Sequence, residues 1–241
     1  MASCHSIPIN AATRVHAWVT ALLRLSIVLL ANYRLDMGLS INMKDSPSLL
    51  RPGSISSKRP RPIPNSYWAT PLVLACEFPW SPFERCTSKC KLDALLAAGV
   101  RTFVDLTESG ELKPYSSILC RRAELQGIDP DTVEYHRFPI RDRSLPESVG
   151  YMHRVLEVLR DNRDRGRISA VHCRGGIGRT GMVIGCWLVQ SGMAKDGDEA
   201  LEIIAKEWRT VEKHTRYPHS PETGPQFEFV KSFHAGKDLG S

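Results

Sequence analysis

The sequence predicts an α/β fold in which a parallel-rich central sheet is flanked by helices. Short apolar runs typical of buried strands alternate with segments of helical periodicity along most of the chain. This alternation favours parallel strands joined by right-handed helical crossovers. The 241 residues, of which 42% are hydrophobic, suffice for one sizeable core and an extension. We therefore expect one domain with an N-terminal tail.

The domain is expected to cover residues 67–236. Four strands are predicted from short apolar runs, at residues 71–76, 101–106, 133–138 and 168–172. Five helices are predicted from the periodicity of apolar residues, at 91–98, 116–125, 182–190, 198–208 and 224–233. One more helix is expected to start at Ser144, because the sequence SLPE reads as a capping box with proline in the first turn.

Residues 1–66 are predicted to form a disordered or helical basic extension followed by a proline-rich linker. Residues 1–61 contain 8 Lys/Arg and 2 Asp/Glu, and this excess accounts for the whole net charge of +6. The first 35 residues are amphipathic and carry three arginines and no acidic residue, a composition typical of a mitochondrial presequence or a membrane-surface helix. An extension without a role is the alternative. Membrane contact is expected only through this segment.

Charge and cysteine usage narrow the classes of function. The body of the chain is neutral with interspersed signs, so nucleic acid is not an expected partner. The seven cysteines are odd in number and irregularly spaced, which favours reduced thiols and a cytoplasmic location; a mitochondrial location through residues 1–35 is the alternative. Cys86 and Cys90 lack a second Cys/His pair at zinc-like spacing, so no metal site is predicted.

The segment most informative about chemistry is ISAVHCRGGIGRTG, residues 168–181. A strand that runs into glycines opening a helix directs backbone N–H groups and a helix N-terminus at one small volume, which is an anion site. Arg179 can fork two N–H bonds onto a tetrahedral oxyanion such as phosphate, and the same groups favour the thiolate form of Cys173. Only Cys173 among the cysteines has arginine six residues later. The loop therefore predicts phosphate binding beside a nucleophile.

The sequence HCRGGIGRTG resembles the signature loop of the cysteine-dependent protein tyrosine and dual-specificity phosphatases. Together with FVDLTESGELKPY and PIRD, the layout from Tyr67 to about Phe233 is most similar to the compact dual-specificity type associated with cyclin-dependent kinases. The resemblance implies a phosphorylated protein substrate, hydrolysis of phosphotyrosine through a phosphocysteine intermediate, and no cofactor or metal. Activity on phosphoserine and phosphothreonine stays open.

The resemblance also implies residue roles in the loop. Cys173 would attack phosphorus and Arg179 would hold the phosphoryl oxygens. His172 would orient the loop, and the Thr180 hydroxyl would donate a hydrogen bond to the sulfur. The residues between Cys173 and Arg179 would bind the substrate phosphate; they are Arg174, Gly175, Gly176, Ile177 and Gly178.

A proton donor for the leaving oxygen is expected on a loop after a neighbouring strand. Asp142 in FPIRDRSLP resembles the family's general acid, with Asp129 and Asp131 as rivals. The adjacent Arg141 and Arg143 favour the charged carboxylate, which opposes an acid role unless they point away.

Two further polar side chains are weaker candidates. Gln226 resembles the glutamine with which some members hold the hydrolytic water, although a glutamine on a surface helix is the more common case. Glu108 could pair with Arg179, or could be an ordinary loop carboxylate.

Three other functions remain alternatives. A catalytically silent phosphate-binding module would keep the loop without turnover. A sulfur-transfer or arsenate-reducing enzyme would use the cysteine loop but not the acid Asp142. A phosphoinositide phosphatase would resemble the loop, but such enzymes carry two lysines in it, and here those positions are Arg174 and Ile177. Phosphotyrosine is thus the expected substrate.

Overall fold

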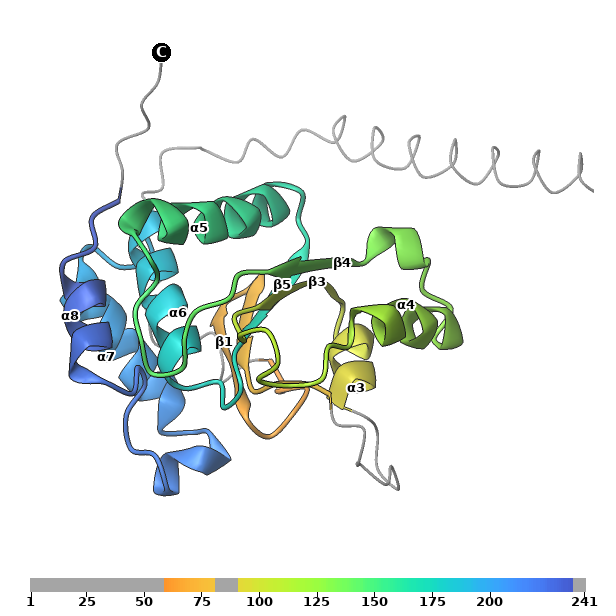
Figure 1. The fold of residues 1–241 in the computed structure, drawn as a ribbon, viewed down its shortest axis with the longest axis horizontal. Coiled ribbons are helices and arrows are strands. Elements are labelled where there is room, and N and C mark those ends of the chain that lie inside the picture. Colours follow the sequence, from red (N-terminus) through yellow and green to blue (C-terminus); the bar gives the residue numbers. More distant parts are fainter. Residues whose placement is uncertain (1–58, 81–90, 236–241) are drawn as a thin grey trace, which may run out of the picture. The chain divides into compact units, whose positions relative to one another are not determined.

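Five strands form one sheet in the order β1-β2-β5-β3-β4 in the computed structural model, which describes residues 59–80 and 91–235 (Figure 1). The sheet is parallel except for the antiparallel pairing of β1 with β2. The strands are β1 Ser66–Thr70, β2 Val73–Cys76, β3 Val100–Asp105, β4 Glu134–Arg137 and β5 Ile168–His172. The predicted fold class is confirmed.

Helices cover both faces of this sheet (Figure 1). On one face lie α3 Lys91–Ala97 and α4 Ser116–Leu125, joined to β4 through the short 3-10 helix η1 Pro130–Thr132. On the other lie α5 Val149–Asp164, α6 Gly178–Gln190, α7 Gly197–Trp208 and α8 Gly224–Lys231, with the 3-10 helix η2 Glu212–Thr215 between the last two. No helix in the described ranges is long and apolar enough to cross a membrane.

The central strands β3 and β5 are buried along nearly their whole length because helices cover both of their faces. In β5, Ala170 packs into the core under α3 and α4, and its neighbour Val171 packs into the core under α5 to α8. Phe103 and Val104 of β3 divide between the two cores in the same way. A strand buried on both faces reads as a continuous apolar run rather than as an alternating pattern. Because β5 is the central strand of the sheet, the loop that follows it leaves from the middle of the edge where the parallel strands end.

Three elements differ from the prediction. Strand β1 was not predicted, because its residues were assigned to the domain entrance; Pro71 and Leu72 form the turn that pairs it with β2. Helix α5 begins at Val149, not in the predicted capping box at Ser144, because the Ser148 hydroxyl caps it by accepting a hydrogen bond from Tyr151 N at 3.0 Å.

Helix α6 begins at Gly178, four residues earlier than predicted. The apolar periodicity becomes clear only at Met182, whereas glycines have low helix propensity and so conceal the first turn. The consequence is functional, because Arg179 and Thr180 lie inside the first turn of the helix rather than in a loop before it.

The last residues of the predicted linker pack against the domain. Ile63 is buried, and its carbonyl accepts a hydrogen bond from the Ser66 hydroxyl at 2.7 Å. The Arg59 guanidinium lies 3.7 Å from the centre of the Trp68 ring. These contacts fix the chain from residue 59 onward to the sheet. The amphipathic segment predicted at residues 1–35 lies outside the described residues.

Candidate active site

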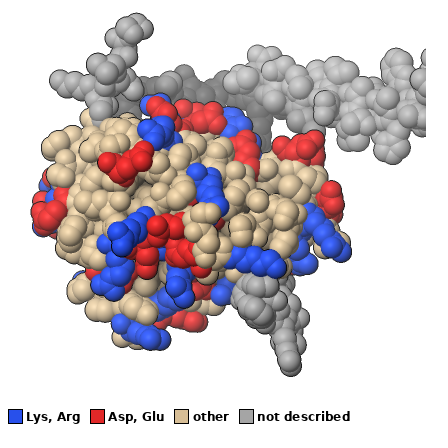
Figure 2. Space-filling view, viewed as in Figure 1, with Lys and Arg blue, Asp and Glu red and all other residues tan. Residues whose placement is uncertain are grey.

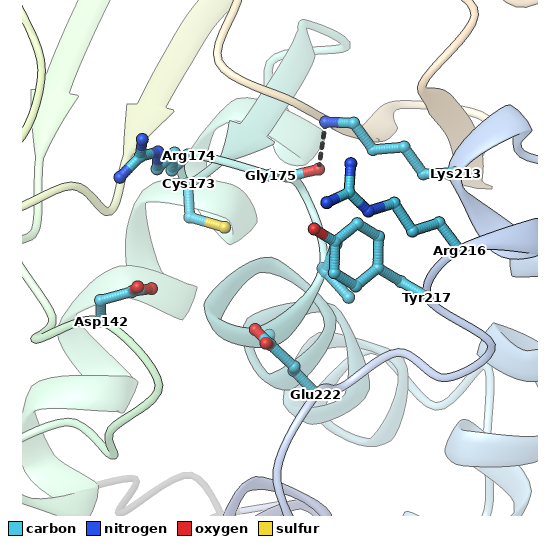
Figure 3. Close-up of a pocket in the computed structure, with 10 residues that line it drawn as sticks. Asp142, Cys173, Arg174, Gly175, Lys213, Arg216, Tyr217 and Glu222 are labelled. Carbon is cyan, nitrogen blue, oxygen red and sulfur yellow. Dashed lines mark hydrogen bonds between the residues drawn. The ribbon is translucent and has the colours of Figure 1, made fainter.

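The carboxyl ends of three parallel strands meet at one edge of the sheet. Asp105 at the end of β3 pairs in register with Arg137 of β4 and with His172 of β5. The loops that follow these strands therefore leave from neighbouring points, at the place where open α/β sheets bind ligands. Beside them is a cavity of about 540 Å³, lined by Asp142, Cys173, Arg174, Gly175, Ile177, Gly178, Lys213, Arg216, Tyr217 and Glu222 (Figure 3).

The loop after β5 wraps tightly from strand to helix. Cys173 follows the strand directly and is only 3% exposed, so its sulfur lies at the bottom of the cavity. Gly176 has a φ of 75°, and a Cβ there would lie 2.6 Å from the carbonyl carbon and oxygen of Cys76. Only glycine fits this left-handed position against a neighbouring strand. The loop is thereby held with the N-terminus of α6 close to Cys173, an arrangement suited to an anion.

Arg179 connects the three loops. Its guanidinium is 1% exposed and forms a two-pronged ion pair with Glu111, with both N–O distances at 2.7 Å. Nη1 also donates to the carbonyl of Ile140 at 3.0 Å, and Nη2 donates to Asp142 Oδ1 at 2.8 Å. Nε–H is buried and donates to no other described group. The arginine is thus fixed along one side and keeps a donor for a ligand.

Glu111, and not Glu108, is the carboxylate that holds Arg179. The hydrogen bond from Arg179 is the main reason why the pKa of Glu111 lies below its usual value. Glu108 instead accepts a hydrogen bond from the backbone N–H of Asp142 at 3.1 Å, and its own N–H donates to Glu111. The two glutamates of the loop after β3 therefore position the arginine and the acid loop separately.

Asp142 lies at the cavity, and its rivals do not. Its side chain is 53% exposed and faces the cavity across from the wall formed by residues 213–217 (Figure 3). Asp129 and Asp131 lie at η1, which precedes β4, and Asp129 caps that turn by accepting the N–H of Asp131. They are therefore at the opposite edge of the sheet. Arg143 has a φ of 59° and forms an ion pair with Glu222 at 3.2 Å.

His172 is fully buried behind the loop. Burial lowers its pKa, outweighing the opposing effect of Asp105, whose carboxylate lies 3.8 Å from Nδ1. The hydroxyl of Tyr115 lies 2.6 Å from Nε2, and burial raises the pKa of Tyr115 well above its usual value. Tyr115 and His172 therefore share a hydrogen bond in which the tautomer of the neutral imidazole decides which group donates. His172 therefore positions the loop as a neutral ring.

The remaining predicted residues lie close to the loop. Thr180 is fully buried, and its hydroxyl makes no hydrogen bond to another described group. Gln226 is also buried: Oε1 accepts the N–H groups of Glu222 and Thr223, both at 3.2 Å, and Nε2 donates to the carbonyl of Ser144 at 3.1 Å. This amide caps α8 and ties it to the acid loop.

Sequence reasoning missed one wall of the cavity, formed by Lys213 of η2 and by Arg216, Tyr217 and Glu222 after it (Figure 3). Lys213 Nζ donates to the carbonyl of Gly175 at 3.2 Å and pairs with Glu77. Although burial opposes it, the hydrogen bond from Lys213 holds the pKa of Glu77 below its usual value. The only sequence signal was a charged, aromatic cluster, KHTRY, in an irregular segment. Within the described ranges no group of three His, Cys, Asp or Glu residues is placed to hold a metal ion.

Known proteins with similar sequences include phosphatases. Phosphatidylinositol 3,4,5-trisphosphate 3-phosphatase and protein-tyrosine-phosphatase PTEN1 of Arabidopsis thaliana is 32% identical over 110 residues, covering 44% of this chain and 25% of that protein. Protein tyrosine phosphatase domain-containing protein 1 of Mus musculus is 27% identical over 172 residues, covering 70% of this chain and 21% of that protein. The chain thus spans about a quarter or less of the length of these two relatives.

Solved structures agree with the sequence relatives. The structure of Tk-PTP in its active form superposes with a TM-score of 0.53 at 25% identity and covers 70% of this chain and 96% of that one. A family model described as Swiss Army Knife protein, DSP-PTPase phosphatase domain, matches residues 65–230. That match includes all five strands, β1 to β5, and the segments that line the cavity, and so the chain belongs to the dual-specificity and protein tyrosine phosphatase family.

Proposed function

We propose that this protein is a cysteine-dependent phosphatase that hydrolyses phosphotyrosine in proteins through a phosphocysteine intermediate. The single observation that carries the proposal is the buried Nε–H of Arg179, which has no partner in residues 59–80 and 91–235 and lies near Cys173 at the N-terminus of α6. A buried donor without a partner is costly unless a ligand accepts from it. A phosphoryl group at this point meets the arginine and the helix N-terminus together, within reach of the thiolate.

In the first step the Cys173 thiolate attacks phosphorus, the S–P bond forms and the bond from phosphorus to the substrate oxygen breaks. Asp142 in its protonated form gives its proton to that oxygen, because an unprotonated tyrosyl or alkyl oxygen is a poor leaving group. Arg179 and the loop N–H groups stabilise the oxygens of the phosphoryl group throughout.

In the second step a water attacks phosphorus, gives a proton to Asp142, and releases inorganic phosphate as the S–P bond breaks. The Thr180 hydroxyl supports this step, since it has no hydrogen-bond partner among the described residues and can donate to the departing sulfur. Gln226 is less suited to hold the water directly, because its amide already makes hydrogen bonds at both ends.

The depth of the site favours phosphotyrosine over shorter phosphoamino acids. Cys173 is almost fully buried, so the substrate phosphate must reach the bottom of the cavity. A phenyl ring carries its phosphate further from the peptide backbone than a serine or threonine side chain does, and Tyr217 on the cavity wall offers the ring an aromatic surface. Phosphoinositides are a second candidate, because one curated relative is named for phosphatidylinositol 3,4,5-trisphosphate and cations line the cavity. Ile177 at the centre of the loop weighs against a polyphosphorylated ring.

Phosphate release from p-nitrophenyl phosphate and from a phosphotyrosyl peptide tests the proposal. Wild-type protein should hydrolyse both, and Cys173→Ser should hydrolyse neither while retaining the fold by circular dichroism. Asp142→Ala should slow hydrolysis of the peptide by about 10²–10⁴-fold, the usual contribution of general acid catalysis. Hydrolysis of p-nitrophenyl phosphate should slow much less, because that leaving group needs little protonation. A folded wild-type protein that releases no phosphate would favour the silent binding module.

A further inference from the structure

One cation at the mouth of the cavity has no task in the proposed reaction. Arg216 is exposed, lines the cavity, and forms no ion pair with any residue in the described ranges. Lys213 is different, because Glu77 and the carbonyl of Gly175 hold its ammonium group. Lys213 supports the loop, whereas Arg216 presents a free guanidinium to whatever enters.

The hydroxyl of Tyr217 is a second hydrogen-bond donor beside Arg216. The Arg216 guanidinium lies 5.5 Å from the ring of Tyr217, and Figure 3 shows the Tyr217 hydroxyl and the guanidinium both directed towards the loop, on the side of Gly175. Asp142 lies across the cavity from them (Figure 3). A forked cation beside a hydroxyl donor, with a held ammonium group adding positive potential, suits a carboxylate or phosphate.

We propose that Arg216 and Tyr217 form a second anion site, which selects phosphotyrosyl peptides that carry a carboxylate or phosphate close to the phosphotyrosine. This inference rests on the proposed function. With the phosphotyrosine in the cavity, flanking residues of an extended peptide run across its mouth, where Arg216 is exposed.

The lining of the cavity offers a polyphosphorylated lipid headgroup mixed surroundings. Extra phosphates on an inositol ring would lie inside the cavity, where they face the carboxylates of Asp142 and Glu222 and the apolar Ile177 as well as the cations Arg174, Lys213 and Arg216. A peptide carries its second anion outside the cavity on a separate side chain. That anion can reach Arg216 without approaching the two carboxylates.

The test compares kcat/KM for two phosphotyrosyl peptides that differ only in the residues flanking the phosphotyrosine. The acidic peptide carries glutamate or phosphoserine there, and the neutral peptide carries glutamine. Wild-type protein should prefer the acidic peptide by about fivefold at low salt, the upper range for an exposed ion pair, and less at high salt. Arg216→Gln should reduce the ratio towards one, and Tyr217→Phe should lower it partly. Arg121→Gln is the matched control, since it removes one exposed positive charge from α4, on the other face of the sheet.

Equal rates for the two peptides in the wild type, or a preference that survives Arg216→Gln, would overturn the second anion site while leaving the proposed function intact. A soluble phosphoinositide hydrolysed in place of both peptides would overturn the proposed function and the site with it. Thermal unfolding of each variant checks that a lost preference does not come from a lost fold.

Discussion

Arg179 is the side chain on which the geometry of the site depends most. It is buried, it donates to Glu111, Asp142 and the carbonyl of Ile140, and these partners come from the loops after β3 and β4. A buried guanidinium is costly unless its donors are satisfied, so each partner restricts where the arginine can lie. The residue that would bind phosphate is therefore positioned before the substrate arrives.

Glu111→Gln should lower stability and kcat/KM more than Glu108→Gln does. Glutamine at 111 leaves the Arg179 charge without its two-pronged partner, and breaking a buried ion pair costs about 3 kcal/mol or more. We expect that loss in the free energy of unfolding by urea denaturation, together with a tenfold or larger fall in kcat/KM, roughly 1.4 kcal/mol per power of ten. Glutamine at 108 still accepts the N–H of Asp142. A Glu108→Gln variant as damaged as Glu111→Gln would contradict this division of roles.

His172 should make stability depend on pH. Its pKa in the folded protein lies below the value of 6.5 expected for the unfolded chain, because burial disfavours the charged ring. Above pH 6.5 the ring is neutral in both the folded and the unfolded state, so stability is complete there. As pH falls from 6.5 through the folded pKa, the unfolded chain takes up the proton first and stability is lost.

Chemical denaturation between about pH 7 and pH 5 measures this effect. The wild-type free energy of unfolding should fall across that range, and His172→Gln should show a flatter profile. Glu77 and Glu111 do not interfere, because their pKa values lie below 4.5 and their loss of stability comes at lower pH. Parallel profiles for the two proteins would show that His172 is not the titrating group.

At the scale of elements, the turn from β5 into α6 is the most constrained part of the fold. Gly176→Ala would place a methyl group 2.6 Å from the backbone of Cys76 on β2, in addition to the cost of a left-handed conformation of about 1–2 kcal/mol. Gly192→Ala is a matched control, because Gly192 has a φ of 72° and nothing within 4 Å of the added carbon.

Both alanine variants should lose stability in thermal unfolding, and Gly176→Ala should lose more. Only Gly176→Ala should lose most of its activity on p-nitrophenyl phosphate, because it displaces the loop that holds Cys173. Equal activity in the two variants would mean that the loop can adjust without cost.

The same elements show what can be predicted from the sequence. Cys173 and Arg179 were recognisable because one continuous segment carries the strand, the loop and the helix start. Glu111, which holds Arg179, and Arg216, which lines the cavity, were not, because they lie 62 residues before and 43 residues after Cys173 and neither is in a periodic pattern. The start of α5 was misplaced because SLPE fits a capping box as well as Ser148 fits a cap.

At the scale of the whole molecule, positive and negative charges balance in residues 62–241, and the excess of positive charge is in residues 1–61. Lys and Arg are interspersed with Asp and Glu over the face shown in Figure 2. Selectivity for an anionic substrate must then come from local groups such as Arg179 and Arg216 and not from a general positive field. This separates what the domain does from what the N-terminal segment contributes.

Two truncations should distinguish those contributions. Removing residues 1–58 takes away most of the basic excess and none of the described contacts, so Tm and kcat/KM should stay unchanged. A changed location in the cell would identify the segment as a targeting signal. Removing residues 1–65 also deletes Ile63, whose burial stabilises by about 1.5–3 kcal/mol, and the cation–π contact of Arg59 with Trp68, worth about 0.5–1 kcal/mol.

The longer truncation should therefore lower Tm by several degrees, and it should weaken the active site through Asn65. The side-chain oxygen of Asn65 accepts the backbone N–H of Lys213 at 3.2 Å, and its backbone carbonyl accepts the N–H of Glu77 at 3.0 Å. Asn65 therefore links the start of the domain to the Lys213–Glu77 ion pair, which supports the phosphate loop. Asn65→Ala in the full chain isolates that link, and kcat/KM should fall with little change in Tm. If the 1–58 truncation already unfolds the protein, residues before 59 contribute to the core.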